Sequence, residues 1–377
     1  MGNQPVFDNR YRYDHIYPRG RSGETLRAVD TQNNDRPVVI KRPAPQDAPP
    51  LRAAQEVSIL TEKRALERLS GHASLTELRG SGIFRAGGNS YQYIVMDRAV
   101  GETVQQMVLS LAPQDKRPPD LEILVIVDAL LDLLMAAHAA HVVYNDVDAK
   151  HLFWNRDAYR LKVIDWGNAV MLDEASHPAN ISAASDIYQV GELLYFIYQG
   201  GARFTSESTP EGDYTVIFKH EIPDAIRDII TRATHPSIKN QRYASIRNLR
   251  DSLSAYRLPM ERERNEIIQQ VQSRLVDNAS QQLLQTLDSE LDSVFVLDPG
   301  FPPARRLRED IRLRLQHLAV QADFDATRIY LETGNWSRAI HLIEELIPSA
   351  DPQTAKALVF LVSAAEQLRQ SGHAEPP

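Results

Sequence analysis

The chain of 377 residues contains no cysteine, and this absence removes several kinds of chemistry. Disulfides, thiolate nucleophiles and cysteine-based metal sites are all excluded. A basic tract is missing as well. The net charge is -8, and Lys and Arg are mixed with Asp and Glu along the whole chain. Because a nucleic-acid footprint needs clustered positive charge, we expect no nucleic-acid partner.

The sequence also lacks an uninterrupted apolar run long enough to span a membrane. The longest apolar stretch, Leu121 to Val143, contains Glu122, Asp128 and Asp132. Each of these acids would cost roughly 3 kcal/mol inside a bilayer, so we predict a buried helix without membrane contact. Met1 to Tyr13 is polar and does not show the basic and then apolar pattern of a secretion signal, which predicts a cytoplasmic protein.

The patterning of the chain changes along its length, which suits two domains. From Tyr11 to about Met96, short apolar runs separated by turn residues predict a small sheet, with one helix from Ala53 to Leu69. Helical patterns dominate after that. They cover Leu121 to Val143, Ala184 to Tyr198, Pro223 to Thr234 and Ser245 to Tyr256. After Leu258 the composition shifts to Gln, Glu, Arg and Leu, which indicates a second, helical unit.

Two segments carry the most specific motif. Residues 144–154 read Y-N-D-V-D-A-K-H-L-F-W, and residues 163–167 read V-I-D-W-G. The pair resembles the catalytic loop H-R-D-L-x-x-x-N and the metal-binding turn D-F-G of protein kinases. In that family the first Asp orients the attacking hydroxyl, and the Asn and the second Asp hold metal ions. The resemblance therefore implies that Asp146 is catalytic and that Asp165 and His151 are metal ligands, with His151 at the Asn position.

The resemblance covers about residues 11–256 and implies an α+β, bilobal protein-kinase-like fold followed by an all-α extension. The expected divisions are an N-terminal extension over 1–10, a kinase-like domain over 11–257, and a helical domain over 258–377. The kinase-like domain should have a small β-rich lobe at 11–98 and a large α-rich lobe at 99–257. Its relatives would be divergent bacterial kinases of the Ser/Thr type. The segment S-D-I-Y-Q-V-G-E that begins at Ser185 matches the family helix whose Asp, here Asp186, bonds the backbone of the catalytic loop.

Further matches to the family concern the phosphates of a nucleotide. Gly20 and Gly23 occupy two of the three glycine positions of the Gly-rich phosphate loop, although an ordinary hairpin turn would read the same way. Lys41, at the end of V-V-I-K, matches the Lys that pairs with phosphates and with a helix Glu. Glu62 is its expected partner because the apolar residues that follow it have the family's spacing.

Other matches concern the base. The backbone at Asp97 and Ala99 should contact an adenine edge, and Val39 and Phe153 should form the walls of the pocket. Both walls are bulkier than the residues usual in the family, and a crowded pocket could exclude adenine. The resemblance thus implies ATP with Mg or Mn as the candidate cofactor.

Several departures from the family weaken phosphate transfer. Asp148 replaces a loop Lys; at roughly 4 Å and an effective dielectric of about 20, each unit of charge changes the energy by about 4 kcal/mol, so the reversal could cost several powers of ten in rate. His151 either binds a borderline metal such as manganese or loses the second metal. Asn145 replaces the Arg that grips a phosphorylated activation segment. Asp165 and Asp186 are only 21 residues apart, with no A-P-E motif between them, so the platform for a peptide substrate is truncated.

The C-terminal helices contain two segments, 297–305 and 330–340, that resemble tetratricopeptide turns and helices. The spacing is irregular, so true repeats and a generic helical bundle both stay open. In either case the region is expected to bind a protein partner.

Three functions remain open from the sequence. The favoured function is a pseudokinase, or a nucleotide-binding signalling or scaffold module, joined to the helical region. The alternative is an active atypical kinase that transfers the ATP γ-phosphate to a Ser/Thr or small-molecule hydroxyl, using Lys41, Glu62, Asp146 and Asp165. The third is a plain scaffold in which Val39 and Phe153 fill the base pocket.

Overall fold

The computed structural model describes residues 5–20, 22–174, 178, 180–209, 213–237, 242–349 and 352–371. The chain divides into two compact units. The first comprises the residues up to Arg264 together with Val296–Pro302, and the second comprises Asn265–Phe295 and the residues from Pro303 onward. The boundary expected at Leu258 falls inside helix α6 (Ile246–Arg274) instead of at a break in the chain.

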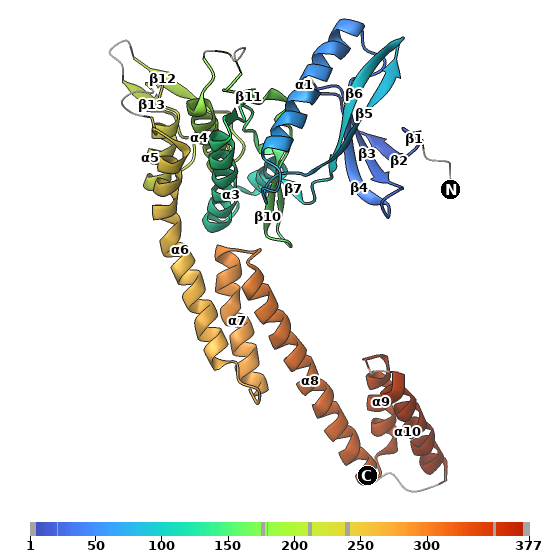
Figure 1. Cartoon of the computed structure of the whole chain (residues 1–377). Coiled ribbons are helices and arrows are strands. Elements are labelled where there is room, and N and C mark those ends of the chain that lie inside the picture. The colour runs from blue at the N-terminus through green and yellow to red at the C-terminus, as the bar shows by residue number, and fades with distance from the viewer. Residues whose placement is uncertain are drawn as a thin grey trace. The chain divides into compact units, whose positions relative to one another are not determined.

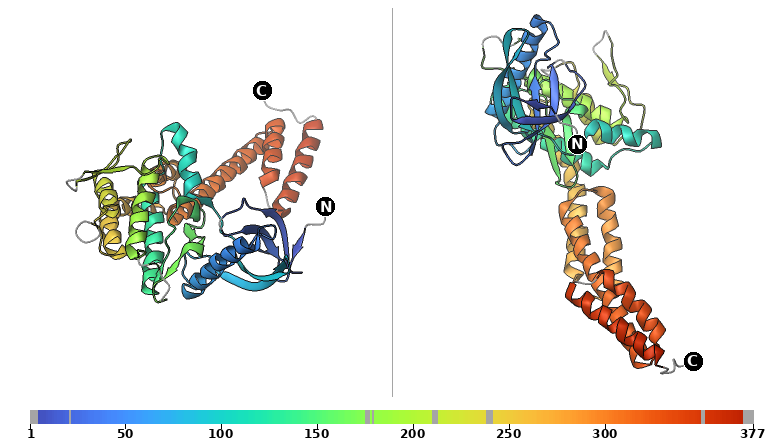
Figure 2. Two further views of the ribbon diagram at one scale, coloured as in Figure 1. Left: turned by 90° about the horizontal axis from the view of Figure 1, so that it is seen from above. Right: turned by 90° about the vertical axis from the view of Figure 1, so that its right-hand side faces the viewer.

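The first unit begins with a curled antiparallel sheet in the order β1-β2-β3-β4-β6-β5 (Figures 1 and 2). Its strands are β1 (Val6–Phe7), β2 (Tyr11–Ile16), β3 (Glu24–Asp30), β4 (Arg36–Arg42), β5 (Leu78–Ala86) and β6 (Asn89–Asp97). Burial alternates along β3, as expected for a strand with one face in a core. Leu26, Ile40 and Val95 are buried together on that face. The sheet predicted for this lobe is confirmed.

Val6 and Phe7 belong to this sheet as β1, and residues 8–10 form the turn to β2, although the sequence placed all of them in an extension outside the domain. Phe7 is buried and its ring lies 4.9 Å from the ring of Tyr93. Arg10 forms a two-pronged ion pair with Asp30, with its Nη2 2.6 Å from Oδ2. An apolar side chain and a paired cation are thus enough to add a short strand. Residues 1–4 of the expected extension lie outside the described residues.

Helix α1 (Pro49–Arg68) lies beside the sheet and contacts β4, β5 and β6 (Figure 1). The helix was predicted from Ala53 to Leu69, and it begins earlier because its first positions are prolines, which need no amide donor there. Its buried face includes Ile59, Glu62 and Leu66. The carboxylate of Glu62 therefore lies in the interior of the lobe.

The rest of the first unit is mainly helical. Its helices are α2 (Val104–Leu111), α3 (Asp120–Ala139), α4 (Ala183–Tyr198), α5 (Asp224–Ala233) and α6, with short 3-10 helices η1 (Ala112–Gln114), η2 (Ala149–His151) and η3 (Trp166–Asn168). Short strands complete it: β7 (Glu102–Thr103), β8 (Val142–Val143), β9 (Leu152–Asn155), β10 (Arg160–Val163), β11 (Val170–Met171), β12 (Ser206–Ser208) and β13 (Tyr214–Val216). None of the helices in the described part of the chain is long and apolar enough to cross a membrane.

Helix α3 is buried over most of its surface, as predicted, but it is shorter than the sequence suggested. It ends at Ala139, whereas the apolar pattern continues to Val143. His141 has a left-handed backbone, with φ of 59°, and this conformation ends the helix. The last two apolar residues form β8, which pairs with β11.

Helix α6 is longer than predicted and continues through Pro259 to Arg274. Its N-terminal half is held against α3 by arginines: Arg250 binds Asp128 with two hydrogen bonds of 2.8 and 3.0 Å, and Arg257 lies 2.9 Å from the same carboxylate. Asp128, one of the acids that interrupt the apolar stretch, therefore docks a helix.

The segment Val296–Pro302 belongs to the first unit through one buried acid. Asp298 is fully buried, and its Oδ2 accepts hydrogen bonds from Arg264 and from the hydroxyl of Tyr159, each at 2.6 Å. The guanidinium of Arg264 also lies 3.5 Å from the centre of the Phe301 ring. These contacts attach the turn between α7 and α8 to the first unit.

The second unit is entirely helical in its described residues. It contains the end of α6 and helices α7 (Gln281–Leu297), α8 (Pro302–Glu332), α9 (Trp336–Leu346), η4 (Ile347–Ser349) and α10 (Pro352–Gln370). Helices α9 and α10 form a pair whose core includes Ile343, Leu346 and Leu358. Turns follow α7 and α8 where the sequence indicated them. Helix α8 alone has 31 residues, close to the length of a whole tetratricopeptide repeat of about 34 residues, so the repeat interpretation stays a prediction.

Candidate functional site

Lys41 lies in the middle of the N-terminal sheet, on β4 between β3 and β6. Its ammonium donates to both carboxylate oxygens of Glu62, at 2.9 and 2.7 Å, and to Oδ1 of Asp165, at 2.8 Å. Burial alone would lower the pKa of Lys41, but the negative charges of Glu62 and Asp165 outweigh it and raise the pKa. The structure therefore brings three of the predicted site residues into direct contact.

Glu62 reaches this contact from the buried face of α1, where it is 1% exposed. A buried carboxylate without a cation costs several kcal/mol, so the bond to Lys41 sets the position of α1 against β4. The exposed side of α1 is tied to the segment that follows Asp165. Arg64 lies 2.8 Å from Glu174, and Arg68 lies 2.8 Å from Asp173.

Asp165 occupies the turn between β10 and η3 with a left-handed backbone, φ 64° and ψ 64°. Residues other than glycine adopt this conformation at a cost of roughly 1–2 kcal/mol, and such residues are common at functional sites. Burial alone would raise the pKa of Asp165, but the charge of Lys41 and its hydrogen bond, aided by His151, lower it. The carboxylate is therefore ionised at neutral pH.

The loop that carries Asp146 is anchored by Asp186, in the first turn of α4. The buried carboxylate of Asp186 accepts the backbone N–H of Tyr144 at 3.0 Å and that of Asn145 at 2.7 Å, and it lies 2.7 Å from Nε2 of His138. Asn145 has a φ of 59°, which turns the chain toward the cleft. The predicted bond between Asp186 and the loop backbone is confirmed.

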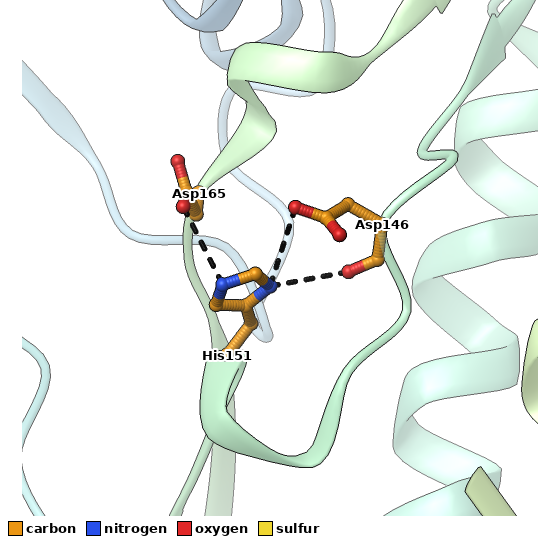
Figure 3. Close-up of side chains that lie close together, drawn as sticks. All are labelled: Asp146, His151 and Asp165. Carbon is orange, nitrogen blue, oxygen red and sulfur yellow. Dashed lines mark hydrogen bonds and ion pairs between the residues drawn. The ribbon is translucent and has the colours of Figure 1, made fainter. Parts of the chain in front are cut away.

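His151 lies between Asp146 and Asp165 (Figure 3). Its Nδ1 is 3.2 Å from the carbonyl oxygen of Asp146 and 3.6 Å from Oδ2 of the same residue, and its Nε2 is 3.4 Å from Oδ2 of Asp165. A carbonyl oxygen can only accept, so Nδ1 carries the hydrogen in that contact. In the neutral ring Nε2 then directs a lone pair at the Asp165 carboxylate, and a cation between these two atoms would satisfy both.

The donor atoms of Asp146, His151 and Asp165 all lie within 4.8 Å of one another. Two carboxylates and an imidazole fit a divalent ion such as manganese, whereas magnesium prefers oxygen ligands alone. The predicted ligands Asp165 and His151 thus lie together, and Asp146 joins them. Asn168, which the sequence did not single out, donates to Oδ2 of Asp146 at 3.0 Å. Asn168 directly follows the D-W-G turn in the sequence, and this position could have identified it as a residue of the site.

The acid at position 148 is neutralised locally. Its carboxylate accepts the backbone N–H of Lys150 at 3.0 Å, capping η2, and lies 2.8 Å from the Lys150 ammonium. Burial would raise the pKa of Asp148, but the bonds from Lys150 lower it. The charge reversal expected from Asp148 is therefore compensated by the ammonium of Lys150, two residues later in the sequence.

A cavity of about 440 Å³ lies beside Lys41 and Asp165 and contains the residues expected around a base. Val39, Phe153, Asp97 and Ala99 all line it. The bulk of Val39 and Phe153 therefore does not close the cavity, which weighs against the plain scaffold with a filled pocket. The side chain of Asp97 is bound in two ion pairs, by Arg36 at 3.0 Å and by Arg79, so only its backbone is suited to a base.

A second cavity, of about 560 Å³, also includes Lys41 and Asp165 in its lining. Its other lining residues are Pro18, Gly20, Ser22, Gly23, Thr25, Asp146, Lys150, His151 and Asn168. The turn between β2 and β3 thus lines this cavity together with the loop of Asp146, and the role of Gly20 and Gly23 in phosphate binding stays a prediction. At Gly23, φ is 95° and a Cβ atom would come within 2.4 Å of the Arg42 carbonyl oxygen, so the turn needs glycine there.

The tip of this turn is linked to the Asp165 turn through small polar groups. Oγ of Ser22 is 3.0 Å from Oγ of Ser58 on α1, and Ser58 donates to the carbonyl oxygen of Gly167 at 3.2 Å. A Cβ atom at Gly167 would come within 2.3 Å of the Ser58 oxygen. The turn, α1 and the D-W-G segment are therefore in direct contact with one another.

Comparison with known proteins agrees with this architecture. No model of a known protein family matches the chain. The chain is 25% identical over 277 residues to the "Probable serine/threonine-protein kinase PknB" of Lactococcus lactis, covering 65% of this chain and 41% of that protein. It is 26% identical over 227 residues to the "Serine/threonine-protein kinase PknL" of Mycobacterium bovis, covering 54% and 52%. It is 23% identical over 261 residues to a PknB of Corynebacterium glutamicum, covering 62% and 38%.

The chain thus spans about half or less of the length of these relatives. The strand-rich lobe precedes the helical lobe, as the kinase resemblance implies. Lys41 contacts Glu62 and Asp165, which the resemblance also implies. The chain therefore has a bilobal protein-kinase-like fold and is a homologue of the bacterial serine/threonine protein kinases.

Proposed function

We propose that the first unit binds a nucleoside triphosphate with a divalent metal and serves as a signalling or scaffold module in which phosphate transfer is weak or absent. The observation that carries this proposal is the contact of Lys41 with Glu62 and Asp165 beside an open cavity of about 440 Å³. Nucleotide-sized sites are typically concave spaces of this order, with a few polar groups at one side.

Each part of the ligand has a counterpart in the chain. The base would lie between Val39 and Phe153 against the backbone of residues 97–99, and Lys41 would bind the first phosphates. Asp165 and His151 would hold the metal, which when bound supplies the positive charge that neutralises the phosphates. Asp165 would then exchange its bond to Lys41 for the metal, which leaves a donor of Lys41 for phosphate.

Weak transfer is supported by features outside this contact. Only 21 residues separate Asp165 from Asp186, which leaves little chain for a peptide platform. Asn145 gives the loop no cation for a phosphorylated segment, and its side chain instead donates to the carbonyl oxygen of Asn168 at 3.3 Å. His151 is buried and fills the position from which an amide would bind a second metal.

An active atypical kinase remains the second candidate, because a specific contact favours it. Asp146 faces the second cavity, and the anion at position 148 is paired with Lys150. Asp146 could therefore accept a hydrogen bond from a substrate hydroxyl and orient it, as the corresponding residue does in kinases.

The second unit is proposed to bind a protein partner. Three consecutive apolar side chains on α10 support this: Val359 is 51% exposed, Phe360 74% and Leu361 40%. Exposed apolar groups in such a cluster are typical of interaction sites.

Nucleotide binding is tested by thermal unfolding with ATP and Mn²⁺. At ten times Kd, binding adds about 1.4 kcal/mol, so the melting temperature should rise by a few degrees. Lys41→Ala and Asp165→Asn should each abolish the rise, and the unliganded melting curve of each variant reports whether it folds. An unchanged melting temperature of the native chain at millimolar ATP would contradict nucleotide binding.

The metal should be manganese in preference to magnesium, because His151 supplies a nitrogen ligand. Isothermal titration of ATP with each metal should give tighter binding with Mn²⁺ for the native chain, and His151→Asn should shift the preference toward Mg²⁺. His141→Asn is the matched control, since His141 is exposed and Asn tolerates its left-handed backbone. Equal preference in the native chain and in His151→Asn would remove His151 from the metal site.

Residual phosphate transfer should depend on Asp146. If the purified chain consumes ATP, Asp146→Asn should reduce the rate by at least about a hundredfold, because the residue positions the attacking hydroxyl. Asp115→Asn, which changes an exposed acid outside the lining of both cavities, should leave the rate unchanged. Consumption that persists in Asp146→Asn would show that this chain is not the catalyst.

Binding by the second unit should depend on the apolar cluster of α10. Phe360→Asp should reduce the recovery of co-purifying proteins from native cells, because a charge replaces an exposed ring. Gln367→Asp on the same helix, also exposed, should not. Equal recovery of every co-purifying protein with both variants would argue against this role for α10.

A further inference from the structure

The two cavities suggest where the end of a triphosphate would lie. Both include Lys41 and Asp165, so they adjoin at these residues. The first cavity contains the residues expected around the base, and the second contains the glycine turn and the loop of Asp146. A nucleotide whose base occupies the first cavity would extend past Lys41, and its terminal phosphate would enter the second.

The second cavity is lined by two ammonium groups, and they differ in their bonding. Lys41 already makes three hydrogen bonds to carboxylate oxygens, which is the full number of donors on an ammonium. Lys150 is about half exposed, and its ammonium has one ion pair among the described residues, to Oδ2 of Asp148 at 2.8 Å. The one donor that Asp165 would release on Lys41 serves the first phosphates, so Lys150 is the ammonium with donors left for the terminal phosphate.

The position of Lys150 is held from two sides. Its backbone N–H donates to Oδ1 of Asp148 at 3.0 Å, and its ammonium lies beside Oδ2 of the same carboxylate. The next residue, His151, is buried against Asp146. The ammonium is thus held in the lining of a cavity that Gly20 and Gly23 also line. A cation at that place complements a phosphate whose other face meets the glycine turn.

We propose that Lys150 is the residue that binds the terminal phosphate of the nucleotide, with Asp148 as the residue that positions it. The assignment rests on the proposed nucleotide binding and names the group that distinguishes a triphosphate from a diphosphate. Asp148 and Lys150 together restore the cation that the family carries at position 148.

The test compares a non-hydrolysable ATP analogue with an imido bridge between its β- and γ-phosphates and ADP, each titrated with Mn²⁺ by calorimetry. The native chain should bind the analogue more tightly than ADP. Lys150→Met should weaken the analogue by about tenfold or more, as expected for loss of a charge-assisted hydrogen bond, and leave ADP unchanged. Lys150→Arg should keep most of the preference, and Lys116→Met, which removes an exposed lysine outside both cavities, should keep all of it.

The outcomes separate the two proposals. If the native chain binds both nucleotides and Lys150→Met weakens both equally or neither, the assignment of Lys150 is wrong and nucleotide binding stands. If the native chain binds neither nucleotide, the proposed function fails, and the assignment fails with it. Unchanged unliganded melting of Lys150→Met excludes loss of folding as the cause of weaker binding.

Discussion

The arrangement of the first unit depends on one buried ammonium. Lys41 joins a strand of the sheet, the buried face of α1 and the turn before η3, because it donates to carboxylates from both of the latter. The buried ammonium of Lys41 and the buried carboxylate of Glu62 are stable only as partners, so removing either one leaves the other uncompensated. This requirement holds α1 against the sheet, and it places the carboxylate of Asp165 between the two cavities.

A second buried acid, Asp186, holds the loop of Asp146 in the helical lobe, as Glu62 holds α1 in the sheet lobe. Asp186 binds two successive amides of the loop and the ring of His138, so the loop can adopt the left-handed turn at Asn145 without leaving its backbone donors unpaired. The side chains of Asp146 and His151, which this loop carries, then lie close to the carboxylate of Asp165. Two buried carboxylates, one on α1 and one on α4, thus determine where the polar groups of the cleft converge.

Much of this could be predicted from the sequence because its motifs resemble those of protein kinases, and the resemblance implies which positions meet in the fold. A strand ending in Lys41, a helix with Glu62 on its apolar face and a D-W-G turn identify the order of the elements and the residues that meet. The pairing of Asp148 with Lys150 could not be predicted, because spacing along a loop does not give the direction of a side chain. The strand at Val6–Phe7 and the continuation of α6 through Pro259 were also missed, since both depend on packing against distant residues. Resemblance to repeats offered no guide to a helix as long as α8.

The buried contacts of Asp298 have a consequence for the covalent organisation of the chain. The first unit is not a contiguous stretch, because it regains residues 296–302 after the chain has left it. A fragment cut at residue 257, where the kinase-like sequence ends, would lose Arg264, Asp298 and Phe301, and with them the hydrogen bond between Asp298 and the hydroxyl of Tyr159. The side chain of Tyr159, which contacts Asp298 and the ring of Phe301 in the intact protein, would then be exposed to water. Excision of a well-folded kinase-like unit therefore has to retain α7 and the turn that follows it. The two units alternate along the sequence even though each has its own core.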